Sequence, residues 1–288
     1  MYRGIAFEGG GITGLAHIGA LEVLDDQKIY SQLTHFAGSS AGSVFATLAA
    51  CRYSPTNMRK MLLEMDIRKL KSSPWLIVMN IYRLIEQYGW YDGSIIEKTA
   101  GDLLEEVSGD RNITFKQIMN KWGSFLIITT TNVNTGETEY LSPETTPDMT
   151  VAHAIYTSSS LPPLFPPVLK DCQYYVDGGL LNNYPIRVLY KYIPEDSVIG
   201  IKLVGPSEPR SYTKKDQLNV VGYLCRLVEL LHDQNLKIHV EDADWERTIK
   251  VKIGKVSATD FDITDQQKIL LIDKGRIAAL QYFVWKNN

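Results

Sequence analysis

Residues 33–50 constrain the fold of this chain more than any other stretch. An apolar, strand-like run (33–37) is followed by GSSAG (38–42) and then by an apolar run typical of a helix (44–50). A Gly-x-Ser-x-Gly motif between a strand and a helix is typical of a nucleophile elbow, a turn so tight that its flanking positions must lack a side chain. The motif predicts Ser40 at the apex of this turn and at a helix N-terminus, where negative charge is favoured. Taken alone, the same residues could also form a serine/glycine loop that caps a helix.

A second glycine-rich stretch follows the first predicted strand. Residues 4–7 are strand-like, GGGITG occupies residues 9–14, and a helix is expected from residue 15 to about residue 26. The spacing fits the G-x-G-x-x-G of dinucleotide sites, but such sites need an acidic residue at the end of the second strand, where this chain has none. We therefore expect both glycine-rich turns at the carboxyl edge of one parallel sheet. There the first turn would supply oxyanion donors for the serine presented by the second.

The remainder of the chain alternates between strand-like and helix-like segments. A β-branched run predicts a central strand at 125–131, and a turn at 134–136 leads into a second strand at 139–141. Amphipathic or apolar patterns predict helices at 94–107 and 150–158. This alternation favours an α/β fold, a three-layer α/β/α sandwich around a mainly parallel sheet. No linker or repeat interrupts it, so residues 1–288 are expected to form a single domain.

Composition narrows the classes of function. A formal net charge of −3, with 44% hydrophobic and 22% charged residues, is ordinary for a globular protein with a sizeable core and gives no indication of nucleic-acid binding. Three cysteines without C-x-x-C spacing (Cys51, Cys172 and Cys225) favour reduced thiols and a cytoplasmic protein, peripheral at membranes where it contacts them. No apolar run is long enough to span a bilayer. No cluster has the spacing of metal ligands, so neither a metal nor another cofactor is expected.

A third motif completes a recognisable set. Asp177 ends a strand-like run and precedes two glycines, as expected for a carboxylate held on a tight turn; a turn aspartate that bonds its own backbone is the alternative. Together with GGGITG and GSSAG, the DGG at 177–179 resembles the patatin-like phospholipases. SSSLPPLFPP at 158–167 and NYP at 183–185 are similar to the family as well. The resemblance covers roughly residues 2–204, and residues 205–288 add a final amphipathic helix with a capping box at 264–267.

The resemblance implies a lipid acyl hydrolase, either a phospholipase A, a lysophospholipase or an esterase, acting in lipid degradation on a lipid substrate. Ser40 would be the nucleophile and Asp177 the base, and the backbone N–H groups of Gly10, Gly11 and Ala41 would form the oxyanion hole. The motif glycines that shape these turns are Gly9, Gly14, Gly38, Gly42, Gly178 and Gly179. Glu8, directly before the loop, departs from what many relatives carry and bears on the loop's conformation. The implied chemistry needs no metal, because a carboxylate within reach of Oγ can take its proton directly.

Three alternatives follow from the same residues. A Ser-Asp-His triad would use His232 or His239, which lie in the required chain order, but that fold places its nucleophile after several strands and only two are predicted before Ser40. A nucleotide- or anion-binding protein is disfavoured by the missing acid. A catalytically inactive scaffold is disfavoured because Ser40 and Asp177 are both intact.

Residues 68–91 are the candidate region for membrane contact. A basic run ends at Lys71, and an apolar helix with aromatic residues at its ends is predicted at 74–85. Such a combination could lie on an anionic lipid surface. A helix that packs over the pocket as a cap, with its neighbouring charges solvated, is the favoured interpretation.

Overall fold

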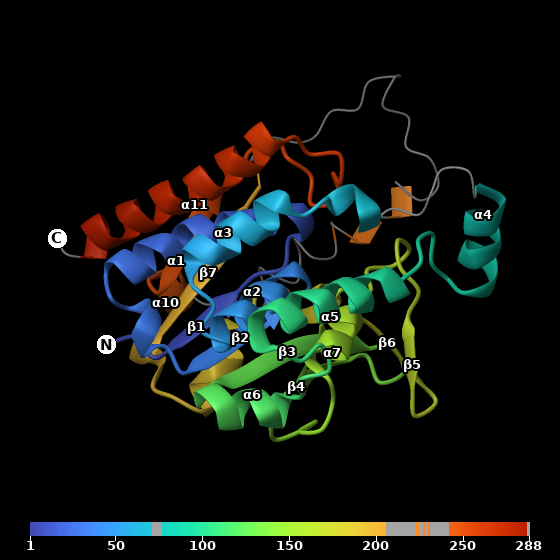
Figure 1. Cartoon of the computed structure of the whole chain (residues 1–288), viewed down its shortest axis with the longest axis horizontal. Helices are drawn as coiled ribbons and strands as arrows, with labels where there is room; N and C mark the ends of the chain where they lie inside the picture. The colour runs from blue at the N-terminus through green and yellow to red at the C-terminus, as the bar shows by residue number, and fades with distance from the viewer. Residues whose placement is uncertain (71–76, 206–222, 225–226, 229, 231–241, 287–288) are drawn as a thin grey trace.

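The computed structural model describes residues 1–70, 77–205, 223–224, 227–228, 230 and 242–286. In this part of the chain one eight-stranded sheet has the order β5-β6-β3-β2-β1-β7-β8, and β4 also pairs with β3 (Figure 1). The strands are β1 (Gly4–Phe7), β2 (His35–Ser39), β3 (Phe125–Asn132), β4 (Glu137–Leu141), β5 (Val168–Lys170), β6 (Gln173–Asp177), β7 (Val198–Val204) and β8 (Thr248–Lys252).

The strands pair in parallel around β1 and antiparallel at one side. β1 pairs in parallel with β2 and β7, β2 with β3, and β7 with β8. In this register Phe7 lies beside Gly38, so the loops that follow β1 and β2 leave the same edge of the sheet. β6 is antiparallel to β3, with Asp177 opposite Thr130, and Ser39 is opposite Thr129 on the same strand. The end of β6 therefore lies one strand away from the turn after β2.

The main helices lie mostly on one side of the sheet. They are α1 (Ala16–Asp26), α2 (Ala41–Ala50), α3 (Pro55–Glu64), α4 (Ile77–Glu86), α5 (Ser94–Ser108), α6 (Phe115–Trp122), α7 (Val151–Ser158), α8 (Gly179–Asn182), α10 (Asp242–Trp245) and α11 (Asp265–Lys286). Short 3-10 turns supplement them, among them η1 (Gly11–Leu15), η3 (Ile67–Leu70) and η5 (Ile186–Lys191). In the described residues no helix is both long and apolar enough to cross a membrane.

Alternate residues of the central strands enter two separate cores. Ile5 and Phe7 of β1 belong to the larger cluster, which α1, α2, α7 and α11 also supply, whereas Ala6 belongs to the smaller one. The smaller cluster is closed by residues 184–193, including the buried Ile186 and Leu189. This period of two is what a strand buried on both faces requires. The predicted α/β fold is confirmed: helices flank a central, mainly parallel sheet.

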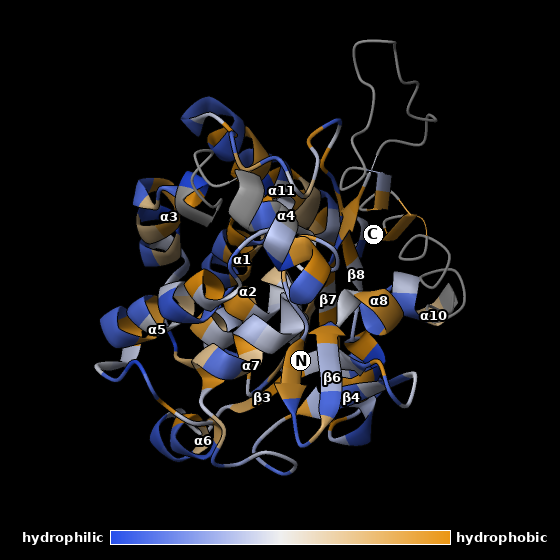
Figure 2. Ribbon diagram, turned by 90° about the vertical axis from the view of Figure 1, so that its right-hand side faces the viewer, coloured by the Kyte–Doolittle hydropathy of each residue, from blue (hydrophilic) through white to orange (hydrophobic). Residues whose placement is uncertain are grey.

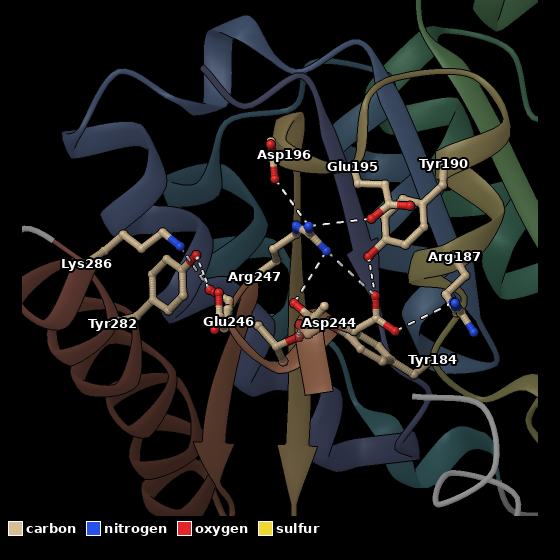
Figure 3. A network of polar contacts seen from close by, with 12 residues as sticks. Tyr184, Arg187, Tyr190, Glu195, Asp196, Asp244, Glu246, Arg247, Tyr282 and Lys286 are labelled. Carbon is tan, nitrogen blue, oxygen red and sulfur yellow. Dashed lines mark hydrogen bonds and ion pairs between the residues drawn. The ribbon is translucent and has the colours of Figure 1, made fainter. Parts of the chain in front are cut away.

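A polar network joins the segments that precede β7 and β8, at the edge of the sheet opposite the glycine-rich turns. The buried Asp244 carboxylate accepts a hydrogen bond from the Tyr190 hydroxyl at 2.6 Å and lies 3.7 Å from the Arg187 guanidinium (Figure 3). Arg247 pairs with Asp196 at 3.2 Å, and the Tyr282 hydroxyl of α11 donates to the Glu246 carbonyl at 3.2 Å. The network ties α11 to the sheet.

Several predicted elements are confirmed, and two differ from the prediction: the start of the first helix and the character of α11. The strands at 4–7 and 125–131, the hairpin into β4 and the capping box of α11 are present, the last with Thr264 and Gln267 bonded reciprocally at 2.9 and 3.3 Å. The helix expected from residue 15 begins earlier, as η1, because Gly11 adopts a φ of +52° that starts a tight turn. α11 was predicted to be amphipathic, and it is not, since large apolar side chains also cover its outer face.

Candidate active site

The turn after β2 is a nucleophile elbow. Ser40 has φ 51° and ψ −130°, a conformation that side-chain-bearing residues rarely adopt. A Cβ on Gly38 would lie 2.3 Å from the Gly42 carbonyl oxygen, and one on Gly42 would lie 2.4 Å from the Phe7 carbonyl oxygen. Backbone cannot give way cheaply at such distances, so both glycines are sterically required. The strain at Ser40 is held by neighbouring strands and places its side chain at the N-terminus of α2.

Ser40 and Asp177 are brought into direct contact. The Ser40 Oγ donates a hydrogen bond to Asp177 Oδ2 at 2.7 Å, although 137 residues separate them in the chain. The other carboxylate oxygen, Oδ1, accepts from the Gly179 N–H at 2.7 Å, which fixes the plane of the carboxylate. A Cβ on Gly178 would lie 2.4 Å from the Thr129 carbonyl oxygen, so this glycine lets the turn press against β3.

The environment of Asp177 makes its carboxylate a stronger base than usual. The residue is 1% exposed, and burial raises its pKa from 3.8 to about 7, against the opposing effect of the hydrogen bonds from Ser40 and the Gly179 N–H. Burial outweighs the two hydrogen bonds, so the net effect is a raised pKa. A base with a pKa close to neutral both accepts and releases a proton readily at neutral pH.

The loop after β1 lies against Ser40. The Gly9 N–H donates to the Asn183 carbonyl at 3.0 Å, and the Asn183 side-chain amide donates to the Gly9 carbonyl at 3.1 Å. Among the described residues, the N–H groups of Gly10, Gly11 and Ala41 have no hydrogen-bond acceptor. All three residues line the same pocket as Ser40. The three donors are therefore available to a ligand oxygen.

The remaining motif glycine, Gly14, allows close packing behind this loop. A Cβ there would lie 3.0 Å from the Phe45 ring of α2 and 3.5 Å from the Ala41 Cβ. Gly9 is tighter still, since its Cβ would lie 2.9 Å from the Ser40 Cβ. Both glycines thus set the distance between the two glycine-rich turns.

Two supporting residues have roles that the sequence motifs did not reveal. The Ser158 hydroxyl, at the end of α7, accepts the Ser40 N–H at 2.9 Å and so orients the elbow from the opposite side. The Asn183 contacts with Gly9 hold the first loop. Both residues lie in segments that resemble the family, SSSLPP and NYP. The sequence therefore marked these segments, but it did not show which residue contacts the Ser40 turn or the glycine-rich loop.

The contacts of Glu8 stabilise the start of the glycine-rich loop and are not directed at Ser40. Its carboxylate is buried, lies 2.5 Å from the Lys202 ammonium, and accepts the Leu203 N–H at 2.6 Å. Its carbonyl bonds His17 Nε2 at 2.9 Å. Burial lowers the pKa of His17 to about 4, so this imidazole is neutral at neutral pH. Glu8 thereby ties the start of the glycine loop to β7, which agrees with the expectation that it affects loop conformation.

A pocket of about 250 Å³ opens from the Ser40–Asp177 contact. Its wall is almost wholly apolar and comes from α2, α3, η3, α5, α7 and the segment 161–165. Side chains representative of that wall are Phe45, Leu62, Ile96, Leu103, Leu164 and Phe165. Ala258, Thr259 and Phe261 also contribute, so the pocket includes residues beyond the stretch that resembles the family. Such a lining suits an apolar ligand group.

Of the five histidines in the chain, the structure describes three, and none of these three is bonded to Ser40 or Asp177. His153 pairs with Glu97 at 3.0 Å, and His35 lies beside the Thr34 hydroxyl at 2.9 Å. His17 is bonded to Glu8, as described above. His232 and His239 lie outside the described residues. In the described residues no group of three or more His, Cys, Asp or Glu side chains is placed to hold a metal ion.

The region 68–91 lies partly outside the described residues, since 71–76 are not described. α4 projects from the body of the molecule, and Figure 2 looks onto the face from which it projects. Tyr82 and Ile85 are exposed and Asn80 is buried, and none of the α4 side chains that the structure describes lines the pocket. The described side chains of α4 therefore do not contribute to the pocket wall, and the interpretation of this helix as a cap stays a prediction.

The fold defines an α/β protein whose helices flank a mainly parallel sheet. The chain belongs to the patatin-like phospholipase family, whose sequence pattern it matches over residues 5–190.

Similarity to individual proteins agrees with this assignment. Protein YqhO of Bacillus subtilis is 30% identical over 96% of this chain and 96% of its own length. The probable lipid hydrolase 463L of Invertebrate iridescent virus 6 is 28% identical over 66% of this chain and 64% of its own length. The crystal structure of VipD from Legionella pneumophila shares the fold, with a TM-score of 0.66 at 18% identity, over 98% of this chain and 66% of that one.

Proposed function

We propose that this protein hydrolyses acyl esters of lipids through a catalytic dyad of Ser40 and Asp177. The observation that carries the proposal is the 2.7 Å hydrogen bond from the Ser40 Oγ to the Asp177 carboxylate at the inner end of an apolar pocket. Membership of the patatin-like phospholipases and the similarity to a probable lipid hydrolase support a lipid ester as substrate.

In the acylation step, Ser40 Oγ attacks the ester carbonyl carbon while its proton passes to Asp177 Oδ2. The carbonyl π electrons move onto the oxygen, which lies near the N–H groups of Gly10, Gly11 and Ala41. The N-terminus of α2 adds its dipole to this stabilisation. Collapse of the tetrahedral intermediate breaks the ester C–O bond, the alcohol leaves with the proton held by Asp177, and the acyl group remains on Ser40.

In the deacylation step, Asp177 removes a proton from a water molecule that attacks the acyl-enzyme. The second tetrahedral intermediate uses the same three donors and collapses with cleavage of the Ser40–acyl bond. The proton on Asp177 returns to Ser40 Oγ, and a fatty acid is released. Because one carboxylate acts twice, its pKa near neutral suits both proton transfers.

The direct contact also favours a dyad over a triad. A histidine acting as base would have to stand between the serine hydroxyl and the carboxylate, each within hydrogen-bond reach of the ring. At 2.7 Å the Ser40 Oγ and Asp177 Oδ2 leave no space for an imidazole between them.

Replacement of the nucleophile tests the proposal. Ser40→Ala is expected to abolish turnover of a short-chain ester while the variant stays folded, because one hydroxyl at a turn contributes little stability. Ser159→Ala is the matched control, since Ser159 lines the same pocket without a contact to Asp177, and it is expected to keep turnover within about threefold. A folded Ser40→Ala variant with most of its activity would refute the proposal.

We also propose that the lipid surface is approached by the face that carries α4. Tyr82, Ile85 and Tyr88 are exposed there, and the Tyr88 ring packs edge-on against that of Tyr174, itself exposed. The segment after α4 is bonded to the pocket wall, with the Tyr91 N–H donating to the Leu164 carbonyl at 2.7 Å. Exposed aromatic and aliphatic side chains beside a pocket mouth suit the interfacial region of a bilayer.

Ile85→Ser tests this second proposal. The expected result is at least a fivefold loss of activity on lipid vesicles with no change on a dispersed monomeric ester. Met119→Ser on α6 is the matched control, because Met119 is also exposed and belongs neither to α4 nor to α11. Equal activity of wild type and Ile85→Ser on vesicles would contradict the proposal.

We propose, finally, that residues 1–288 form one domain. Support comes from the sheet, in which β1 lies between β2 and β7, and from the pocket, whose wall includes residues from Gly9 to Phe261.

A further inference from the structure

The C-terminal helix α11 is held firmly to the body of the protein by its inner face. A Cβ on Gly19 would lie 1.8 Å from the Ile272 carbonyl oxygen, and one on Gly275 would lie 1.8 Å from the Ala16 carbonyl oxygen. The two helices α1 and α11 are therefore in backbone contact at two points. At the far end, Tyr282 bonds both the Tyr2 hydroxyl and the Glu246 carbonyl (Figure 3). The orientation of α11 about its axis is fixed by these contacts.

With the inner face so fixed, the outer face of α11 presents a row of large apolar side chains to solvent. Each of them is between 40% and 64% exposed. This outer stripe consists of Ile269, Leu270, Ile277, Leu280, Val284 and Trp285. At 3.6 residues per turn, all but Trp285 fall within about 100° of the helix circumference. The helix has 22 residues and is therefore about 33 Å long, and Figure 1 shows it along an outer margin of the molecule.

The outer stripe is as large as an interaction surface. Its six side chains expose roughly 600 Å² of mainly apolar area, the upper end of what a monomer's largest patch reaches. With the polar side chains at its margins it approaches the ~800 Å² that each partner of a standard specific interface buries. Scattered surface hydrophobics are ordinary, but six large ones along the outer face of one helix are not.

The spacing of the stripe is self-complementary about Ile277. Leu270 and Val284 each lie seven residues from it, and Ile269 and Trp285 each lie eight residues from it. Two copies of α11 packed antiparallel, with a twofold axis at Ile277, would thus place Ile277 opposite its own copy and Leu270 opposite Val284 of the other copy.

The polar positions select this antiparallel arrangement. Asp273 and Gln281 lie four residues to either side of Ile277 and are both exposed, and the Asp273 carboxylate also lies 3.8 Å from the Arg59 guanidinium of α3 in the same chain. An antiparallel pair brings the carboxylate of one copy opposite the amide of the other, where a hydrogen bond can form. A parallel pair would place Asp273 against Asp273 of the other copy, where the two carboxylates cannot form such a hydrogen bond.

We propose that α11 is the interface of a twofold-symmetric homodimer of this protein. The partner is a second copy because the spacing matches itself, and because an acidic side chain within the stripe is unsuited to an anionic membrane. No residue of α11 lines the described wall of the pocket, so the dimer leaves that wall uncovered. The inference does not depend on the proposed chemistry of Ser40.

The molar mass in solution, measured by light scattering across a concentration series, tests the dimer. The wild type is expected to approach twice the 32.5 kDa mass of the chain at tens of micromolar, and Ile277→Asp to remain at 32.5 kDa. Ile85→Asp on α4 is the matched control, since Ile85 is equally exposed, and it is expected to stay dimeric. Ester turnover by Ile277→Asp should remain within about twofold of wild type, which shows that the variant is folded.

Disulfide trapping tests the register. In a background with Cys172 and Cys225 replaced by serine, Ile277→Cys is expected to form a covalent dimer on mild oxidation. Leu270→Cys alone is not expected to do so, whereas Leu270→Cys mixed with Val284→Cys is. A monomeric wild type at 100 μM, or a dimer that survives Ile277→Asp, overturns the proposal. So does a monomer whose binding to anionic vesicles is lost in Ile277→Asp, because the stripe would then contact lipid.

Discussion

Asp177 should make the protein less stable as the pH rises, and this effect can be isolated. Its pKa in the folded state is about 7, whereas the ordinary value of 3.8 applies once it is exposed by unfolding. Because the folded value is the higher one, the folded state binds the proton more tightly. The contribution of Asp177 to stability is therefore fully present below pH 3.8 and is lost as the pH rises through 7.

The magnitude follows from the difference between the two pKa values. Each unit of pKa corresponds to about 1.4 kcal/mol, so ionised Asp177 lowers the free energy of unfolding by about 4 kcal/mol above pH 7. About 2.5 kcal/mol of this loss falls between pH 5 and pH 8. Asn at this position cannot ionise and should not show the loss, although it cannot act as a base.

Urea unfolding of wild type, Asp177→Asn and Ser40→Ala at pH 5, 6, 7 and 8 measures the effect. The free energy of unfolding of wild type relative to Asp177→Asn is expected to fall by about 2.5 kcal/mol across this range. Ser40→Ala keeps the carboxylate and loses a hydrogen bond that lowers its pKa, so its free energy of unfolding should fall with pH at least as steeply as that of the wild type. Parallel pH dependence of wild type and Asp177→Asn would refute the buried, raised-pKa carboxylate.

Further predictions concern turnover and the glycine loop. The kcat/KM for a soluble ester should rise with pH through about 7 as Asp177 loses its proton, and a profile flat from pH 5 to 8 would argue against this base. His153→Gln should keep turnover within about tenfold of wild type, since His153 pairs with Glu97 and not with the dyad; a hundredfold loss would contradict the dyad. Glu8→Gln should destabilise the fold by about 3 kcal/mol in urea unfolding, because it leaves the buried Lys202 without its counter-charge; a change within error would show that the pair is not structurally important.

The glycine-rich turns of the site could be predicted from the sequence because each is specified by a short motif of neighbouring residues. A Gly-x-Ser-x-Gly turn has one steric solution, and the contacts at Gly38 and Gly42 show why other residues do not fit. The central strands were predictable for a related reason, since residues 125–131 are apolar and β-branched as a strand buried on both faces must be.

What could not be predicted depends on contacts between distant residues. The ion pair of Glu8 with Lys202 joins residues 194 apart, and no local pattern marks Lys202 as buried. The pocket wall at 258–261 and strand β8 come from the stretch without a recognised motif. The outer stripe of α11 has a helical period, but only the structure shows that a second face is already buried against α1.

Covalent trapping of the nucleophile is the most direct test of the central claim. A lipid-like fluorophosphonate should lose fluoride and form an adduct on Ser40, found by mass spectrometry in the tryptic peptide 29–52 and assigned by fragmentation among Ser39, Ser40 and Ser43. Ser40→Ala should remain unlabelled, and Asp177→Asn should react at least about a hundredfold more slowly. An adduct on any other residue, or an active enzyme that the reagent does not label, would contradict the Ser40–Asp177 mechanism.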